Sequence, residues 1–227
     1  MTFYEFFAGG GMVRAGLGAR WRCLFANDVS PQKARIYRRN WGGDRLVLAD
    51  IAALTSAELP DVPDLVWGSF PCQDLSVAGT GAGLAGQRSG SFWSLIGLLH
   101  DLKDQGRAPP LIVLENVLGT LSANCGADFI ALCQAVAELG YDLGAVVMDA
   151  ADFLPQSRPR LFIIAVRQGI PPPDALVASG PQSPWHSPAI VTAYQRSPQW
   201  LQQHWRWWAM PTPAPRVLEL ADLIETG

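Results

Sequence analysis

The sequence is short of lysine, of positive charge and of long apolar segments. Lys33 and Lys103 are the only lysines among 227 residues, so arginine supplies the other cations. The formal net charge is −3, which excludes a general electrostatic attraction to nucleic acid and leaves only local or assisted binding. No apolar run reaches membrane-spanning length before a charge or a glycine interrupts it, and the first residues lack the positive start of a signal peptide. We therefore expect a soluble, cytoplasmic protein.

Cysteine is also scarce, and its placement argues against two classes of protein. The four cysteines have neither the paired spacing of zinc ligands nor the density of a secreted disulfide scaffold; they are Cys23, Cys72, Cys125 and Cys133. We expect reduced thiols and no bound metal. Hydrophobic residues make up 49% of the chain, which is enough for a substantial core in one large or two small domains.

Short apolar runs alternate with helix-like segments over the first 170 residues. Ser30 and Pro31 form a good helix start, because serine can cap a helix and proline fits its first position. Thr55 and Glu58 have capping-box spacing for a further short helix. The alternation favours an α/β fold with a mostly parallel sheet and helices on both faces. The predicted strands are residues 2–7, 22–27, 46–48, 64–67, 111–114, 141–148 and 161–166, and the main predicted helices are residues 12–17, 31–40, 92–102 and 128–139.

A run of three glycines, Gly9 to Gly11, joins the first strand to the first helix. Glycine lets a ligand approach the backbone closely, and N–H groups at the start of a helix point toward such a ligand. The match to the dinucleotide fingerprint is incomplete, since Arg14 stands where the third glycine would be. Asp28 ends the second strand about twenty residues later, the spacing at which an acidic residue meets ribose hydroxyls. A purely structural turn, with Asp28 as a turn residue, remains the alternative.

Cys72 follows the strand at 64–67 and the chain-breaking Pro71. It therefore lies at the carboxyl end of a strand, the edge at which ligands bind in open α/β sheets. A nucleophilic thiol is one interpretation, and a buried core cysteine is the other. The glycine-rich segment 79–90 that follows predicts a mobile loop suited to closing over a substrate.

Two more groups of polar residues adjoin predicted strands. Glu115 and Asn116 follow the apolar strand at 111–114, on the same edge as the thiol, where a carboxyl could hold a proton or simply face solvent. Arg158 and Arg160 precede the strand at 161–166. They are two apart on an extended segment and so point to one face. These arginines could bind an anion or a carbonyl oxygen, or be solvated surface residues.

Taken in order, these segments closely resemble the motifs of the DNA cytosine-5 methyltransferases. The resemblance covers Thr2 to Arg167 and implies the Rossmann-like sheet of the S-adenosylmethionine-dependent methyltransferases. The blocks that carry it are Phe7-Ala8-Gly9-Gly10-Gly11, Asn27-Asp28, Asp50-Ile51, Gly68-Ser69-Phe70-Pro71-Cys72-Gln73, Glu115-Asn116-Val117 and Gln156-Ser157-Arg158-Pro159-Arg160.

The resemblance implies transfer of a methyl group from S-adenosylmethionine to carbon 5 of a cytosine flipped out of duplex DNA, as in bacterial DNA modification. Cys72 would add to ring carbon 6, Glu115 would hydrogen-bond ring nitrogen 3, and Arg160, with Arg158 nearby, would hold the 2-carbonyl oxygen. Phe7, Ala8, Gly9 and Gly11 would line the methionine end of the cofactor, Asp28 the ribose, and Asp50 with Ile51 the adenine. Gln73, Ser76, Asn116 and Gln156 would belong to the substrate site or its closing loop. The ribose acid is usually glutamate in the family, so Asp28 is one methylene shorter.

The last part of the chain departs from the family pattern. We expect a catalytic domain at residues 1–170, a linker or partner-contact segment rich in proline and tryptophan at 171–215, and the start of a connection to a target-recognition region at 216–227. The crowded tryptophans could equally cover the edge of the chain's own core. They are Trp185, Trp200, Trp205, Trp207 and Trp208. The target-recognition region and the two final motifs are absent, so we expect either a subunit completed by a second polypeptide or a shortened chain.

Three rival functions stay open at this point. An RNA cytosine-5 methyltransferase would share the chemistry, and a cofactor-binding subunit that is inactive without a partner would share the fold. A nicotinamide-dependent oxidoreductase would share the glycine turn, but Cys72 and Glu115 do not suit it.

Overall fold

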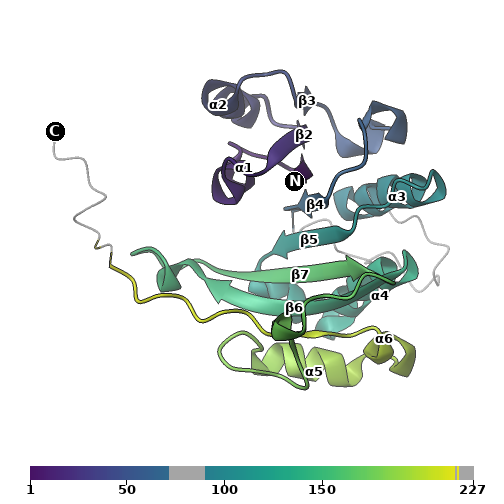
Figure 1. Ribbon diagram of the computed structural model, residues 1–227, viewed down its shortest axis with the longest axis vertical. Coiled ribbons are helices and arrows are strands. Elements are labelled where there is room, and N and C mark those ends of the chain that lie inside the picture. The colour runs from purple at the N-terminus through teal and green to yellow at the C-terminus, as the bar shows by residue number, and fades with distance from the viewer. Residues whose placement is uncertain (72–89, 218, 220–227) are drawn as a thin grey trace.

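The computed structural model describes residues 1–71, 90–217 and 219. Its centre is a sheet of seven strands in the order β3-β2-β1-β4-β5-β7-β6 (Figure 1). Every strand runs parallel to its neighbours except β7, which is antiparallel to both β5 and β6. The predicted α/β class with a mostly parallel sheet is confirmed. The strands are β1 (Thr2–Phe6), β2 (Arg22–Asp28), β3 (Leu46–Leu48), β4 (Leu65–Gly68), β5 (Leu111–Asn116), β6 (Tyr141–Asp149) and β7 (Pro159–Arg167).

Helices cover both faces of this sheet. One face carries α1 (Met12–Leu17) and α2 (Pro31–Trp41), which enclose a core around Phe3, Tyr37 and Leu65. The other face carries α3 (Ser91–Asp104) and α4 (Ala127–Glu138), whose leucines and phenylalanines pack in the larger core. Among the described residues, no helix is both long and apolar enough to cross a membrane.

Local capping signals explain several of the boundaries. The Ser30 side chain accepts a hydrogen bond from the Lys33 backbone N–H, and Pro31 occupies the first position of α2, as predicted. Thr55 and Glu58 form the predicted capping box, but the helix they start is a single 3-10 turn, Ser56–Glu58. A similar turn, Ile51–Ala53, is capped by the Asp50 carboxylate, which accepts from the Ala52 N–H at 2.9 Å.

The segment expected to be a linker or a partner-contact surface is instead folded against the sheet. It forms β8 (Val177–Ala178), α5 (Pro188–Arg196), α6 (Gln199–Gln203) and β9 (Trp207–Trp208). Four of its five tryptophans are buried, and only Trp200 is exposed, at 38%. The tryptophans therefore cover the chain's own core, the alternative interpretation, because they have the edge of β6 to pack on.

That edge is closed by backbone hydrogen bonds as well as by side chains. The Val147 N–H donates to the Trp185 carbonyl, the Leu143 N–H donates to the His204 carbonyl, and the Arg206 N–H donates back to the Leu143 carbonyl. An edge strand left bare would offer unpaired N–H and C=O groups to other chains. The segment therefore completes the sheet as well as the core.

Gly144 on β6 tests this packing. A Cβ at this position would lie 1.8 Å from the Arg206 carbonyl oxygen, so Gly144→Ala must displace the segment. We expect the free energy of unfolding to fall by about 1–3 kcal/mol, measured by urea denaturation. Gly97→Ala in α3 is the control, since a Cβ there meets nothing within 4 Å, and it should raise stability by about 0.5–1 kcal/mol. Equal stability of the two variants would contradict the packing.

Candidate active site

The polar residues predicted for the site gather at one edge of the sheet. The carboxyl ends of β1, β2, β4 and β5 lie there, and so does the amino end of β7, because that strand is reversed. Cys72, Gln73 and Ser76 lie outside the described residues, as does the glycine-rich segment up to residue 89.

The glycine turn after β1 is held by the Asp28 carboxylate. Its Oδ2 atom accepts a hydrogen bond from the Gly9 N–H and its Oδ1 atom accepts one from the Ser30 N–H, both at 2.8 Å. Asp28 is only 3% exposed. The carboxylate thus ties the turn to the end of β2, and each of its oxygens retains a lone pair on the other side. Its contact with a ribose stays a prediction.

The end of α2 clamps the same turn. Trp41 Nε1 donates to the Gly10 carbonyl oxygen at 3.2 Å, and Asn40 Nδ2 donates to the same oxygen at 3.3 Å. A Cβ on Gly11, whose φ is +81°, would lie 2.3 Å from Trp41 Nε1, so only glycine fits there. Sequence reasoning missed both clamping side chains, which lie about thirty residues from the turn and carry no local signal.

The two residues predicted for the adenine end have different surroundings. Asp50 is exposed and uses one oxygen to cap the 3-10 turn that follows it. The Ile51 side chain is buried in the larger core and is 4% exposed. Of this pair, Asp50 is therefore the one whose side chain faces solvent.

Glu115 lies at the centre of a polar network. Its Oε1 atom is 3.3 Å from Arg160 Nε, and its Oε2 atom accepts a hydrogen bond from Ser69 Oγ at 2.8 Å. Ser69 Oγ in turn accepts from Trp67 Nε1 at 3.0 Å. Both side chains of the ion pair are about a fifth exposed, at 24% for Glu115 and 19% for Arg160. The carboxylate and the guanidinium are therefore fixed side by side while still open to a ligand.

Asn116 anchors the chain that leads to Cys72. Its Nδ2 donates to the Phe70 carbonyl oxygen at 3.2 Å, and its Oδ1 accepts from the Val117 N–H at 2.8 Å. Phe70 is itself buried against Phe92, with ring centroids 5.1 Å apart. The backbone is thus fixed two residues before the candidate nucleophile.

The turn between β6 and β7 holds the second arginine. Asp149 accepts hydrogen bonds from the N–H groups of Ala151 and Arg158, which hold the pKa of its carboxyl below the usual range. The Arg158 and Gln156 side chains are exposed. Of the two predicted arginines, the structure brings Arg160 to Glu115 and leaves Arg158 facing solvent. In the described ranges, no group of three or more His, Cys, Asp or Glu side chains could hold a metal ion.

A second buried carboxyl, Glu5, escaped sequence reasoning. It lies on β1, is 1% exposed, and neither of its oxygens has a hydrogen-bond partner within normal geometry. Burial raises its pKa to about 7, against the smaller opposing effects of the Val13 N–H, the Arg14 charge and the Arg14 N–H. The signal available was an acidic residue inside an otherwise apolar strand.

Comparisons with known proteins agree on one family. The model for the C-5 cytosine-specific DNA methylase family matches residues 1–199. A type II methyltransferase of Bacillus subtilis, M.BsuFI, is 31% identical over 72% of this chain and 39% of its own length. A second from the same species, M2.BsuMI, is 35% identical over 73% of this chain and 42% of its own length. The chain thus spans half or less of these relatives.

Solved structures support the fold. The S. pombe Dnmt2 methyltransferase matches with a TM-score of 0.62 at 23% identity, over 76% of this chain and 52% of that one. A prophage-encoded protein described as a putative DNA modification methyltransferase from E. coli matches with a TM-score of 0.58 at 17% identity, over 79% of this chain and 51% of its own. At these identities the likeness shows the fold alone.

Asp28→Asn tests the carboxylate that holds the glycine turn. An amide keeps one acceptor but turns an NH₂ group toward the second backbone N–H, which is left partly buried and unsatisfied. We expect a loss of about 1–3 kcal/mol in the free energy of unfolding, measured by urea denaturation. Asp50→Asn is the matched control. Asp50 caps one N–H at an exposed position, so this substitution should change the free energy of unfolding by about 0.5 kcal/mol or less. Equal effects would show that the turn does not depend on Asp28.

Glu5→Gln tests the buried carboxyl through pH. Between pH 4.5 and about 7 the folded chain keeps the Glu5 proton while the unfolded chain releases it, so stability falls as pH rises through this window and levels off above it. The shift corresponds to about 3 kcal/mol. Relative to Glu5→Gln, the wild type should lose about this much between pH 5 and pH 8 in denaturant titrations. Parallel pH profiles for the two proteins would contradict the prediction.

Proposed function

We propose, from the premise that this chain belongs to the C-5 cytosine-specific DNA methylase family, that it carries the catalytic half of a DNA cytosine-5 methyltransferase. The observation that carries the proposal is the Glu115–Arg160 ion pair, placed on the same sheet edge as the anchored chain before Cys72 and the Asp28-bound glycine turn. The nucleophile, the base-binding groups and the cofactor turn of one reaction would share this edge.

Cys72 is the proposed nucleophile. Its thiolate would form a bond to carbon 6 of a cytosine flipped out of the duplex, and the electron pair of the carbon 5–carbon 6 double bond would become available at carbon 5. Carbon 5 would take the methyl group with S-adenosylhomocysteine as the leaving group; loss of the carbon 5 proton to solvent would then re-form the double bond and expel the thiolate. The hydrogen bond from Asn116 to Phe70 supports this role, because it fixes the backbone that presents Cys72.

Glu115 and Arg160 are the proposed base-binding pair. Ring nitrogen 3 and the 2-carbonyl oxygen of cytosine are both acceptors, so Glu115 would bind nitrogen 3 through a proton shared between them, and the Arg160 guanidinium would donate to the carbonyl oxygen. The hydrogen bond from Ser69 holds the second carboxylate oxygen, so the pair is oriented before a base arrives. Arg158, exposed at the adjacent turn, would contact the substrate from outside, together with Gln156.

The residues at the glycine turn fit S-adenosylmethionine, which supplies an electrophilic methyl group when bound. A Cβ on Gly9 would meet nothing within 4 Å, so the space over the turn is open to a ligand. Phe7, Ala8, Gly9 and Gly11 would hold the methionine end, the free lone pairs of Asp28 would face the ribose, and Asp50 with Ile51 would hold the adenine. Asp28 would reach the ribose directly or through a water, since it is one methylene shorter than glutamate.

We further propose that a second polypeptide, or a further part of a longer chain, completes the enzyme and reads the DNA sequence. Three large apolar side chains are exposed around the glycine turn, Met12 at 75%, Val29 at 62% and Ile36 at 55%. Phe153 and Leu154 are exposed in the turn between β6 and β7. Such side chains beside a site mark surfaces that another segment covers. With DNA as its substrate, and bacterial type II methyltransferases as its relatives, the enzyme would act in the cytoplasm of a bacterium.

The test is transfer of a labelled methyl group from S-adenosylmethionine to mixed-sequence duplex DNA, with the 227-residue chain alone and with Cys72→Ala. We expect Cys72→Ala to remove all detectable transfer and to leave the dissociation constant for S-adenosylmethionine within about twofold, since the proposed cofactor turn follows β1 and Cys72 follows β4 in the chain. Cys125→Ala, which removes an exposed thiol outside the site, is the control and should keep the activity.

Activity in both cysteine variants would rule out the covalent role of Cys72. Full activity of a monomer, established by native mass spectrometry, would rule out the need for a second polypeptide. Cofactor binding without transfer, restored by an added target-recognition polypeptide, would support it.

A further inference from the structure

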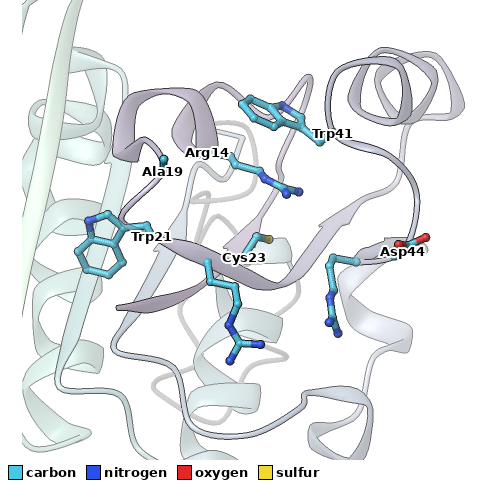
Figure 2. A pocket seen from close by; sticks show the side chains of 8 residues that line it. Arg14, Ala19, Trp21, Cys23, Trp41 and Asp44 are labelled. Atoms are coloured by element: carbon cyan, nitrogen blue, oxygen red, sulfur yellow. The ribbon is translucent and has the colours of Figure 1, made fainter.

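A cavity of about 440 Å³ opens at the opposite edge of the sheet from the candidate active site. Arg22 begins β2 and Arg45 directly precedes β3, so the cavity lies at the amino ends of these strands. The seven residues of β2 separate the two edges by roughly 20 Å, at about 3.3 Å per residue. The cavity therefore opens away from the Glu115 network, and it shares one residue with the cofactor turn, Trp41, which also donates to the Gly10 carbonyl oxygen. Its lining residues are Arg14, Ala19, Trp21, Arg22, Cys23, Trp41, Asp44 and Arg45 (Figure 2).

Positive charge is concentrated in this cavity. Three of the eight lining residues are arginines and one, Asp44, is acidic, in a chain whose net charge is −3. Within the described ranges, the three guanidinium groups form no ion pair with a carboxylate. Like charges around one cavity repel each other, and a bound anion relieves that repulsion.

One of the three arginines is held in place in advance. The Arg14 guanidinium lies over the Trp41 ring, 4.9 Å from its centroid, and Nη1 donates to the Tyr37 hydroxyl at 3.2 Å. Figure 2 shows Arg14 between Trp41 and Cys23. The remaining N–H groups of this fork are available to an anion, with less side-chain entropy to lose on binding. Arg22 and Arg45 are exposed and able to close on it.

An indole supplies the apolar part of the cavity. Trp21 is half-buried, and its ring meets Phe3 edge-on with centroids 6.5 Å apart. Figure 2 shows it on the opposite side of the cavity from Asp44. The floor holds Cys23, whose buried thiol stays neutral because burial raises its pKa. Arginines beside an open aromatic ring are the combination that binds the phosphate and the base of a nucleotide, and the volume falls within the range of small-molecule sites, about 300–1,000 Å³.

We infer that this cavity binds a nucleoside phosphate, with the phosphate on Arg14, Arg22 and Arg45 and the base against Trp21. The ligand is a second one, separate from the methyl donor, and the inference does not rest on the proposed methyl transfer.

The test is isothermal titration calorimetry of the full chain with guanosine 5′-diphosphate, with and without saturating S-adenosylhomocysteine. We expect one molecule bound per chain in both conditions, because the sites lie at opposite edges of the sheet. Inorganic pyrophosphate should bind at least tenfold more weakly, since it lacks a base to stack on Trp21. Arg22→Gln and Arg45→Gln should each weaken the diphosphate at least tenfold, and Arg45→Lys should weaken it less.

Arg20→Gln is the matched control. It removes the same charge from an exposed position close to the cavity but outside its lining, and should leave the affinity unchanged. Three results would overturn the inference: equal weakening in Arg20→Gln, displacement of the diphosphate by S-adenosylhomocysteine, or binding of a duplex oligonucleotide but not of the nucleotide.

Discussion

The candidate site depends on the reversal of one strand. Because β7 runs antiparallel to β5, its amino end lies at the carboxyl edge of the parallel strands. Glu115 is directly opposite Phe162, and Arg160 is two residues before Phe162, so Arg160 and Glu115 are diagonal neighbours on one face. Long side chains bridge that spacing, which accounts for the ion pair at 3.3 Å. A slip of one residue would send Arg160 to the other face and leave the carboxylate without it.

Two polar side chains make this edge rigid through hydrogen bonds that join neighbouring segments. Asp28 joins the end of β2 to the glycine turn after β1, and Asn116 joins the end of β5 to the chain after β4. Each is more than nine-tenths buried and uses both of its side-chain polar atoms, so each fixes two segments that the sheet alone brings near one another. The satisfied hydrogen bonds of these two side chains therefore position the neighbouring groups that remain free for a ligand.

Elements with local signals could be predicted from the sequence, and elements that depend on distant partners could not. The bounds of α1 and β3 match the predicted ranges, and Ser30 caps α2 as expected, because periodicity and capping are properties of a few neighbouring residues. The apolar sequence of β7 does not indicate whether the strand runs parallel or antiparallel to its neighbours. Residues 171–215 suggested a linker or a partner-contact segment because of their prolines and tryptophans, yet four of the five tryptophans are buried in the chain's own core. For the same reason Ser69 and Trp41 were missed, since each acts on a backbone or side chain distant in sequence.

The charge of this chain bears on the proposed division between catalysis and DNA recognition. The groups that would position a base are held by β5 and β7, inside the described sheet. Affinity for a duplex, in contrast, comes mainly from cations on phosphates, and this chain has 17 lysines and arginines against 20 acidic residues. Three of its arginines line the cavity at the amino ends of β2 and β3. This balance supports the proposal that another polypeptide, or a further part of a longer chain, would supply most phosphate contacts and read the sequence.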